Sequence, residues 1–149
     1  MLGRRISFET LAKRGLGLVR RGAARGIDIA PAVEEVRRGK QLEVAVTVDS
    51  PEAGRPLEIG LVCTETYTVF SPQLRARGST EAVEDDVAYE RWIPADSSQS
   101  EQVVTLDVPP DGPFSYDGKY LKFRWRVAAR RPRDRGLDAV RSREIRVLP

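Results

Sequence analysis

Residues 108–129 read VPPDGPFSYDGKYLKFRWRVAA, a turn rich in proline and glycine that leads into a strictly alternating segment. The alternating apolar residues are Leu121, Phe123, Trp125, Val127 and Ala129, and the bases between them are Lys122, Arg124 and Arg126. Because neighbouring side chains on a strand point to opposite faces, this pattern predicts a strand whose apolar row, with its aromatic residues, packs in a core. Its basic row then faces water or a partner.

Similar alternation recurs along the chain between loops rich in polar residues, proline and glycine. The further strand candidates are residues 27–36, interrupted by Pro31, then 42–48, 57–69, 83–92, 104–108 and 141–148. Residues 83–92 alternate through Val83, Val87 and Tyr89. Six or seven strands at hairpin spacing predict an all-β fold, an antiparallel immunoglobulin-like sandwich of two sheets. Alternation argues against a parallel sheet, whose strands are apolar on both faces.

Three residues are expected in the core. Alanine in place of Phe123 or Trp125 would cost on the order of 3 to 5 kcal/mol of stability. Cys63 lies in the apolar row of residues 57–69, so we interpret it as a small core residue rather than a nucleophile. As the one cysteine of the chain it excludes an internal disulfide, which favours a reducing, cytoplasmic location.

The charge divides sharply at residue 26. Residues 1–26 hold seven Lys or Arg against Glu9 alone, a net charge of +6, whereas the remaining 123 residues have a net charge of −3. We therefore expect a basic amphipathic or disordered N-terminal segment over residues 1–26, as a tail or short helix, and a sandwich domain over residues 27–149. A basic amphipathic segment suits an anionic membrane surface, a partner groove or its own domain. The candidate docking residues are Arg4, Arg5, Lys13, Arg14, Arg20 and Arg21.

Histidine and asparagine are absent. This excludes Ser-His-Asp and Cys-His-Asn catalytic arrangements and imidazole metal ligands. The acidic run Glu84, Asp85 and Asp86 lacks the spaced loop pattern of a calcium site. We expect no enzymatic activity, no cofactor and no metal, and the chain shows no module typical of nucleic-acid binding.

Lys122, Arg124, Arg126 and Arg130 form the candidate binding row. Arginine pairs with phosphate in bidentate fashion, so the row could bind phosphorylated or acidic partners. The alternative is a solvated sheet face whose charges meet carboxylates across the strands. We favour the second interpretation, because the body is net negative and such surface pairs are common and weak.

Residues 108–127 are similar to an arrestin-like β-sandwich, the family of arrestins, retromer-type sorting subunits and bacterial sporulation-control relatives. The resemblance rests on the proline-ended strand 104–109, the run Pro113-Phe114-Ser115-Tyr116, the turn at Gly118 and the strand LKFRWRVAA. REIRVLP, residues 143–149, resembles the closing strand of bacterial members. Arrestins have two tandem sandwiches and this chain has the length of one, so no site residue is carried over. The resemblance implies a non-enzymatic adaptor or scaffold that binds another protein.

The leading hypothesis is thus a cytoplasmic, single-domain adaptor with an unidentified protein partner. The alternative is a peripheral membrane protein held electrostatically by residues 1–26. An enzyme that uses carboxylates or tyrosine is a third hypothesis, for which no residues converge on a site. An exposed sheet edge would also allow a homodimer.

Overall fold

The computed structural model describes residues 26–51, 53–70, 78, 81–132 and 139–149, and these residues form no helix. No helix that could cross a membrane occurs in that part of the chain. The strands are β1 (Ile27–Pro31), β2 (Glu35–Arg37), β3 (Gln41–Val48), β4 (Glu58–Phe70), β5 (Glu81–Pro94), β6 (Glu101–Asp107), β7 (Tyr116–Asp117), β8 (Leu121–Arg131) and β9 (Ala139–Leu148).

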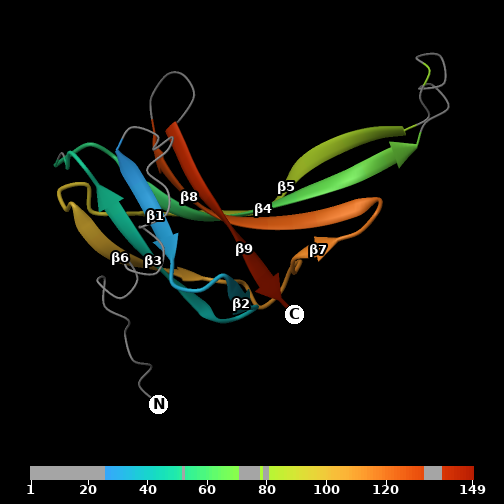
Figure 1. Cartoon of the computed structure of the whole chain (residues 1–149), viewed down its shortest axis with the longest axis horizontal. Helices are drawn as coiled ribbons and strands as arrows, with labels where there is room; N and C mark the ends of the chain where they lie inside the picture. Colours follow the sequence, from blue (N-terminus) through green and yellow to red (C-terminus); the bar gives the residue numbers. More distant parts are fainter. Residues whose placement is uncertain (1–25, 52, 71–77, 79–80, 133–138) are drawn as a thin grey trace.

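Two sheets pack face to face (Figure 1). The smaller sheet has the order β1-β3-β6, and the larger has the order β2-β9-β8-β4-β5, with β7 also paired to β8. All pairs are antiparallel except β2 with β9. The all-β sandwich prediction is confirmed. The described residues form nine strands rather than six or seven, because β2 and β7 have only three and two residues and are too short to show alternation.

The core lies between β1, β3 and β6 on one side and β9, β8 and the first half of β4 on the other. Trp125 is 0% exposed there and packs against Tyr89, with ring centroids 5.5 Å apart. Cys63 is fully buried, and burial, helped by the charge of Glu65, raises the pKa of its thiol to about 11. Its burial confirms that Cys63 is a core residue. A thiol with a raised pKa stays protonated near neutral pH, and a protonated thiol is a poor nucleophile.

The larger sheet extends well beyond the smaller one. We define the arm as residues 64–70 of β4, 81–87 of β5 and 121–124 of β8, together with β7; it projects to the right in Figure 1. No strand of the smaller sheet lies beneath it. Phe123 and Leu121 belong to the arm, so they are only partly buried. Phe123 still packs against the main core cluster, so the expectation that it is a core residue like Trp125 is met only in part.

A β-bulge separates the arm from the sandwich on β5. Cys63 pairs with Tyr89 and Thr64 pairs with Val87, so Ala88 is the extra residue. Tyr89 consequently faces inward, whereas Val87 and Val83 face the opposite side and are exposed, Val83 to 69%. Their alternation with Tyr89 in the sequence does not place them on one face.

Candidate functional site

The four bases of the candidate row project from the outer face of the larger sheet, away from the core. Arg130, Arg126, Arg124 and Lys122 pair in register with Glu58, Val62, Thr64 and Thr66 of β4. These positions alternate with the inward-facing Ile59, Leu61 and Cys63. The four bases thus share one face, but their surroundings differ along it.

Arg130 is held within the fold. Its guanidinium pairs with Glu58 at 3.3 Å and Glu90 at 3.7 Å, and its central carbon lies 4.0 Å from the ring centroid of Trp92. Trp92 can lie flat on the sheet because Gly60 is beneath it: a Cβ at Gly60 would come within 2.5 Å of the ring. Because these contacts engage its guanidinium group, Arg130 has little capacity left to bind a partner.

Of the other three bases, Lys122 and Arg124 lie on the arm, and Arg126 lies just beyond it on β8. Lys122 pairs with Asp117 of β7 at 3.3 Å, a surface pair of the kind that contributes little free energy. Arg124 and Arg126 are exposed, and neither forms a hydrogen bond or ion pair with any residue that the structure describes. Of the predicted row, these two are the remaining candidates for binding a partner.

Apolar side chains accompany these arginines on the outer face of the arm. Thr64 pairs with Val87 on one side and Arg124 on the other, which places both side chains on the same face about 10 Å apart. Further along, the exposed Phe70 and Tyr120 meet edge to face at 5.4 Å. We call this surface the outer arm face; on the arm it includes Thr64, Phe70, Val83, Asp85, Val87 and Arg124, and we add the adjoining Tyr120 and Arg126, which lie just beyond the two ends of residues 121–124. Contiguous exposed apolar side chains commonly mark interaction sites.

The opposite face of the arm is acidic. The hydroxyl of Tyr67 lies 3.1 Å from Glu84 Oε2 and 2.8 Å from Asp86 Oδ2, and these hydrogen bonds raise the pKa of Tyr67. Asp85 instead accepts a hydrogen bond from Thr66 Oγ1 at 2.6 Å on the outer face. The run 84–86 is thus split between two faces, and the described residues contain no cluster of three or more metal-ligating side chains.

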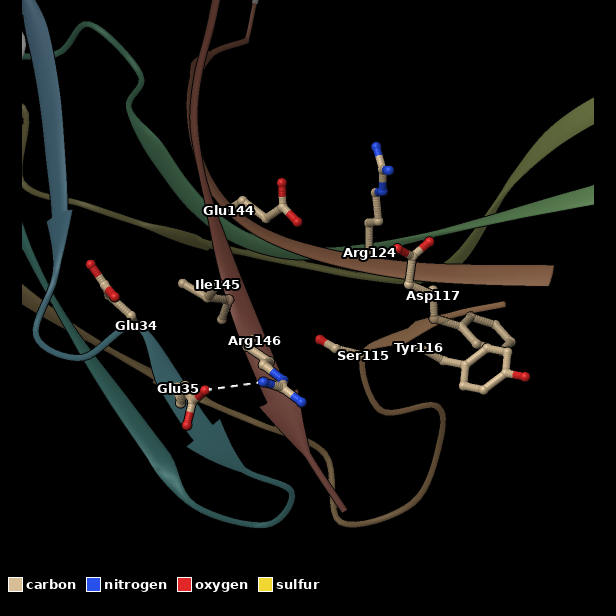
Figure 2. Close-up of a pocket in the computed structure, with 10 residues that line it drawn as sticks. Glu34, Glu35, Ser115, Tyr116, Asp117, Arg124, Glu144, Ile145 and Arg146 are labelled. Atoms are coloured by element: carbon tan, nitrogen blue, oxygen red, sulfur yellow. Dashed lines mark hydrogen bonds and ion pairs between the residues drawn. The ribbon is translucent and has the colours of Figure 1, made fainter. Parts of the chain in front are cut away.

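An open recess of about 530 Å³ lies beside β8, between the part of β8 that pairs with β9 and the part that pairs with β7 (Figure 2). Ser115 connects β9 to the segment before β7. Its amide donates to the carbonyl of Val147, and the amide of Val147 donates to Ser115 Oγ, both at 2.8 Å. Arg146 pairs with Glu35 at 3.4 Å. The lining mixes carboxylates with guanidinium groups, so the recess has no single charge preference and its contacts serve mainly to hold the strands together.

The remaining predicted docking residues, Arg4, Arg5, Lys13, Arg14, Arg20 and Arg21, lie outside the described residues, so their role stays a prediction. A homodimer also stays a prediction. β5 is a free edge of the larger sheet among the described strands. Its five acidic residues oppose pairing with the same edge of a second copy.

Sequence reasoning missed the exposed valines of β5. A usable signal was present: Glu84, Asp85 and Asp86 are consecutive, so acidic side chains occur on both faces of the strand. When both odd and even positions of a strand carry acidic residues, burying either face would place a carboxylate in the core. Val83 and Val87 beside this run could therefore have been expected at the surface.

Comparison with known proteins supports the fold. No family model matches the chain, and no curated protein sequence matches it. Its structure is similar to that of Spo0M, a sporulation control protein from Bacillus subtilis, with a TM-score of 0.54 and 16% sequence identity. The alignment covers 82% of this chain and 48% of Spo0M, so the chain spans about half the length of that protein. The chain has an arrestin-like β-sandwich fold.

Proposed function

We propose that this chain is a non-enzymatic adaptor or scaffold whose arm binds another protein. The outer arm face carries the proposal: it exposes Val83 and Val87 on the side of the sheet that also bears Arg124 and Arg126, and these two arginines have no partner among the described residues. Protein interfaces combine such apolar area with arginine. The arrestin-like fold adds support, and we propose that the chain is a relative of the arrestin and sporulation-control proteins.

The chemistry of the face defines the partner. Arg124 and Arg126 suit carboxylates or phosphates, with which guanidinium groups form two parallel hydrogen bonds. Val83 and Val87 require apolar side chains next to those acids. A protein segment that combines both is thus the expected ligand, and Arg130 does not contribute to its binding.

A capture experiment tests this proposal. The full chain and an Arg124→Glu/Arg126→Glu variant are used to capture proteins from native lysate, with quantitative mass spectrometry as the readout. Lys40→Glu, at an exposed residue of the turn between β2 and β3, is the matched control. Specific partners should be lost with the double variant and with Val83→Asp, and retained with Lys40→Glu. If no protein is captured reproducibly, or all variants capture the same set, the proposal is wrong.

A second candidate function is a cytoplasmic protein attached to an anionic membrane surface by residues 1–26. The observation that favours it is the net charge of +6 in this segment against −3 in the rest of the chain. Flotation with anionic vesicles should be salt-sensitive, since charge attraction at a surface is screened by salt. Reversing Lys13, Arg14, Arg20 and Arg21 to glutamate should abolish it. Equal flotation with neutral vesicles, or with the reversed variant, would contradict this candidate.

A further inference from the structure

One side of β5 has no neighbouring strand. This strand is the last in the order β2-β9-β8-β4-β5, so it forms an edge of the larger sheet among the described strands. Residues 83–88 are all exposed. Edge strands are commonly protected by lysine, proline or a bulge. The bulge lies at Ala88, and residues 81–87 contain neither lysine nor proline, so this stretch keeps the regular backbone that a further strand needs.

At alternate residues of this stretch the backbone hydrogen-bonding groups point away from β4. Thr68 of β4 donates its amide hydrogen to the carbonyl of Tyr120, just before β8, so even residues of β4 bond on that side and odd residues bond toward β5. Beyond the bulge, odd residues of β4 pair with even residues of β5, as Tyr67 does with Glu84. The odd residues of β5 consequently direct their N–H and C=O groups toward the free edge: Val83, Asp85 and Val87.

The side chains along this edge determine the charge of a strand that fits it. Glu84 and Asp86 accept hydrogen bonds from the Tyr67 hydroxyl. Asp85 accepts one from Thr66 on the other face. No base among the described residues forms an ion pair with these three carboxylates. Like charges opposite one another on neighbouring strands are destabilising and opposite charges are stabilising, so the edge disfavours acidic strands and favours a basic one.

We propose that an extended segment of another protein adds to β5 as a further strand of the larger sheet, and that this segment has three consecutive bases between two apolar residues. One base lies opposite Asp85 on the outer arm face, and the other two lie opposite Glu84 and Asp86 on the opposite face, since side chains alternate along both strands. The apolar residues lie opposite Val83 and Val87, which are 69% and 58% exposed. Strand addition to a sheet edge is a common mode of peptide recognition.

This site goes beyond the proposed function and has a different chemistry. The outer arm face binds acidic groups through Arg124 and Arg126, whereas the edge of β5 binds a basic segment through backbone pairing. Val83 and Val87 contribute to both sites, but the two arginines contribute to the first alone. Arg124→Gln/Arg126→Gln should therefore weaken capture of partners by the outer arm face and leave binding at the edge unchanged.

Titration of the full chain with a designed peptide tests the proposal. The peptide Thr-Val-Lys-Arg-Lys-Val-Thr, blocked at both ends and labelled with a dye, is titrated at physiological salt with fluorescence anisotropy as the readout. One control version is N-methylated at both valines and the arginine, and another at both lysines. Only one of these sets of amides faces β5, and which one depends on the direction of the peptide. One version should thus bind at least about tenfold more weakly than the parent, and the other should bind like it.

Variants of the chain separate backbone pairing from charge. Val83→Pro removes an N–H at the edge and should weaken binding about tenfold. Its matched control is Thr105→Pro, at an exposed position whose N–H is directed to the free edge of β6. Glu84→Gln/Asp85→Asn/Asp86→Asn removes the carboxylates and should also weaken binding about tenfold.

Amide hydrogen exchange in the unaltered chain gives a second measurement, which does not depend on whether the variants fold. At saturating peptide the amides of Val83, Asp85 and Val87 should exchange at least about tenfold more slowly, because each gains a hydrogen bond. The amide of Thr105 should exchange at the same rate with and without the peptide.

The contrary outcomes are distinct. The proposal is wrong if the parent peptide does not bind, or if a peptide with glutamate in place of its bases binds equally well. It is also wrong if both N-methylated versions bind like the parent, or if exchange at Val83, Asp85 and Val87 does not slow, since charge alone would then attract the peptide. Loss of captured partners in the arginine variant concerns only the outer arm face, so the two proposals fail separately.

Discussion

The two halves of β8 share one alternating pattern but have different surroundings. In residues 125–131 the inward side chains of Trp125, Val127 and Ala129 are fully buried, because the smaller sheet packs on them. In residues 121–124 the corresponding Leu121 and Phe123 are only partly buried, because they belong to the arm. Alternation therefore shows that a strand has an apolar face. It does not show that another sheet covers that face.

The bases on the other side of β8 differ in the same way. Arg130 meets Glu58, Glu90 and Trp92 over the sandwich, whereas Arg124 lies on the arm without a partner among the described residues. Around Arg130 the outer face is thus occupied by its own contacts. From Arg126 to Arg124 it has no such contacts among the described residues, which is why we propose the partner-binding surface there.

The largest expected difference is between the two aromatic residues of β8. Trp125→Ala should cost about 3 to 5 kcal/mol of unfolding free energy, because it leaves a cavity in the core. Phe123→Ala should cost about 1 to 2 kcal/mol, because part of this ring is already in contact with water. Urea unfolding and soluble yield measure both. Equal costs would mean that the arm is as well packed as the sandwich.

The bases should differ by a smaller amount. Arg130→Ala removes two ion pairs and the stacking on Trp92, and we expect a loss of about 1 to 2 kcal/mol. Arg124→Ala should change stability by less than about 0.5 kcal/mol. Thermal or urea unfolding of the two variants provides the comparison. A larger loss for Arg124→Ala would show that this side chain has a structural partner and is not free for binding.

Tyr67 provides a pH-dependent test of the arm. Its folded pKa is raised above the unfolded value of about 10, so its contribution to stability is fully present below pH 10 and is lost as the pH rises toward the folded pKa. The stability difference between the protein and Tyr67→Phe should therefore shrink above pH 10. Urea midpoints from pH 7 to pH 11 measure this. A constant difference across that range would contradict the hydrogen bonds to Glu84 and Asp86.

The smallest expected effect is at the exposed valines. Val83→Thr and Val87→Thr should each change the unfolding free energy by less than about 0.5 kcal/mol, because both side chains already face water. Val127→Thr is the matched change in the sandwich and should cost about 1 to 3 kcal/mol, because it buries a hydroxyl. A cost at Val83 as large as that at Val127 would indicate that the outer arm face is covered in the isolated chain.

The predictable part of the candidate site was the common face of Lys122, Arg124, Arg126 and Arg130, which follows from their positions along one strand. Which of them are free was not predictable. It depends on Glu58, Glu90 and Asp117, which lie far away in the sequence and become neighbours only through strand pairing. The exposed valines of β5 were obscured by the bulge at Ala88, where the period of two is interrupted.

The sequence by itself determined the all-β class, the inward and outward rows of the long strands, the burial of Cys63 and the charge difference between residues 1–26 and the rest. These properties depend on the local period of two and on composition, which need no knowledge of the partner strands. The tertiary structure alone decided where the smaller sheet ends, and hence which half of β8 is core and which is arm. Burial depends on contacts between segments distant in the chain, so identical local patterns can have opposite exposures.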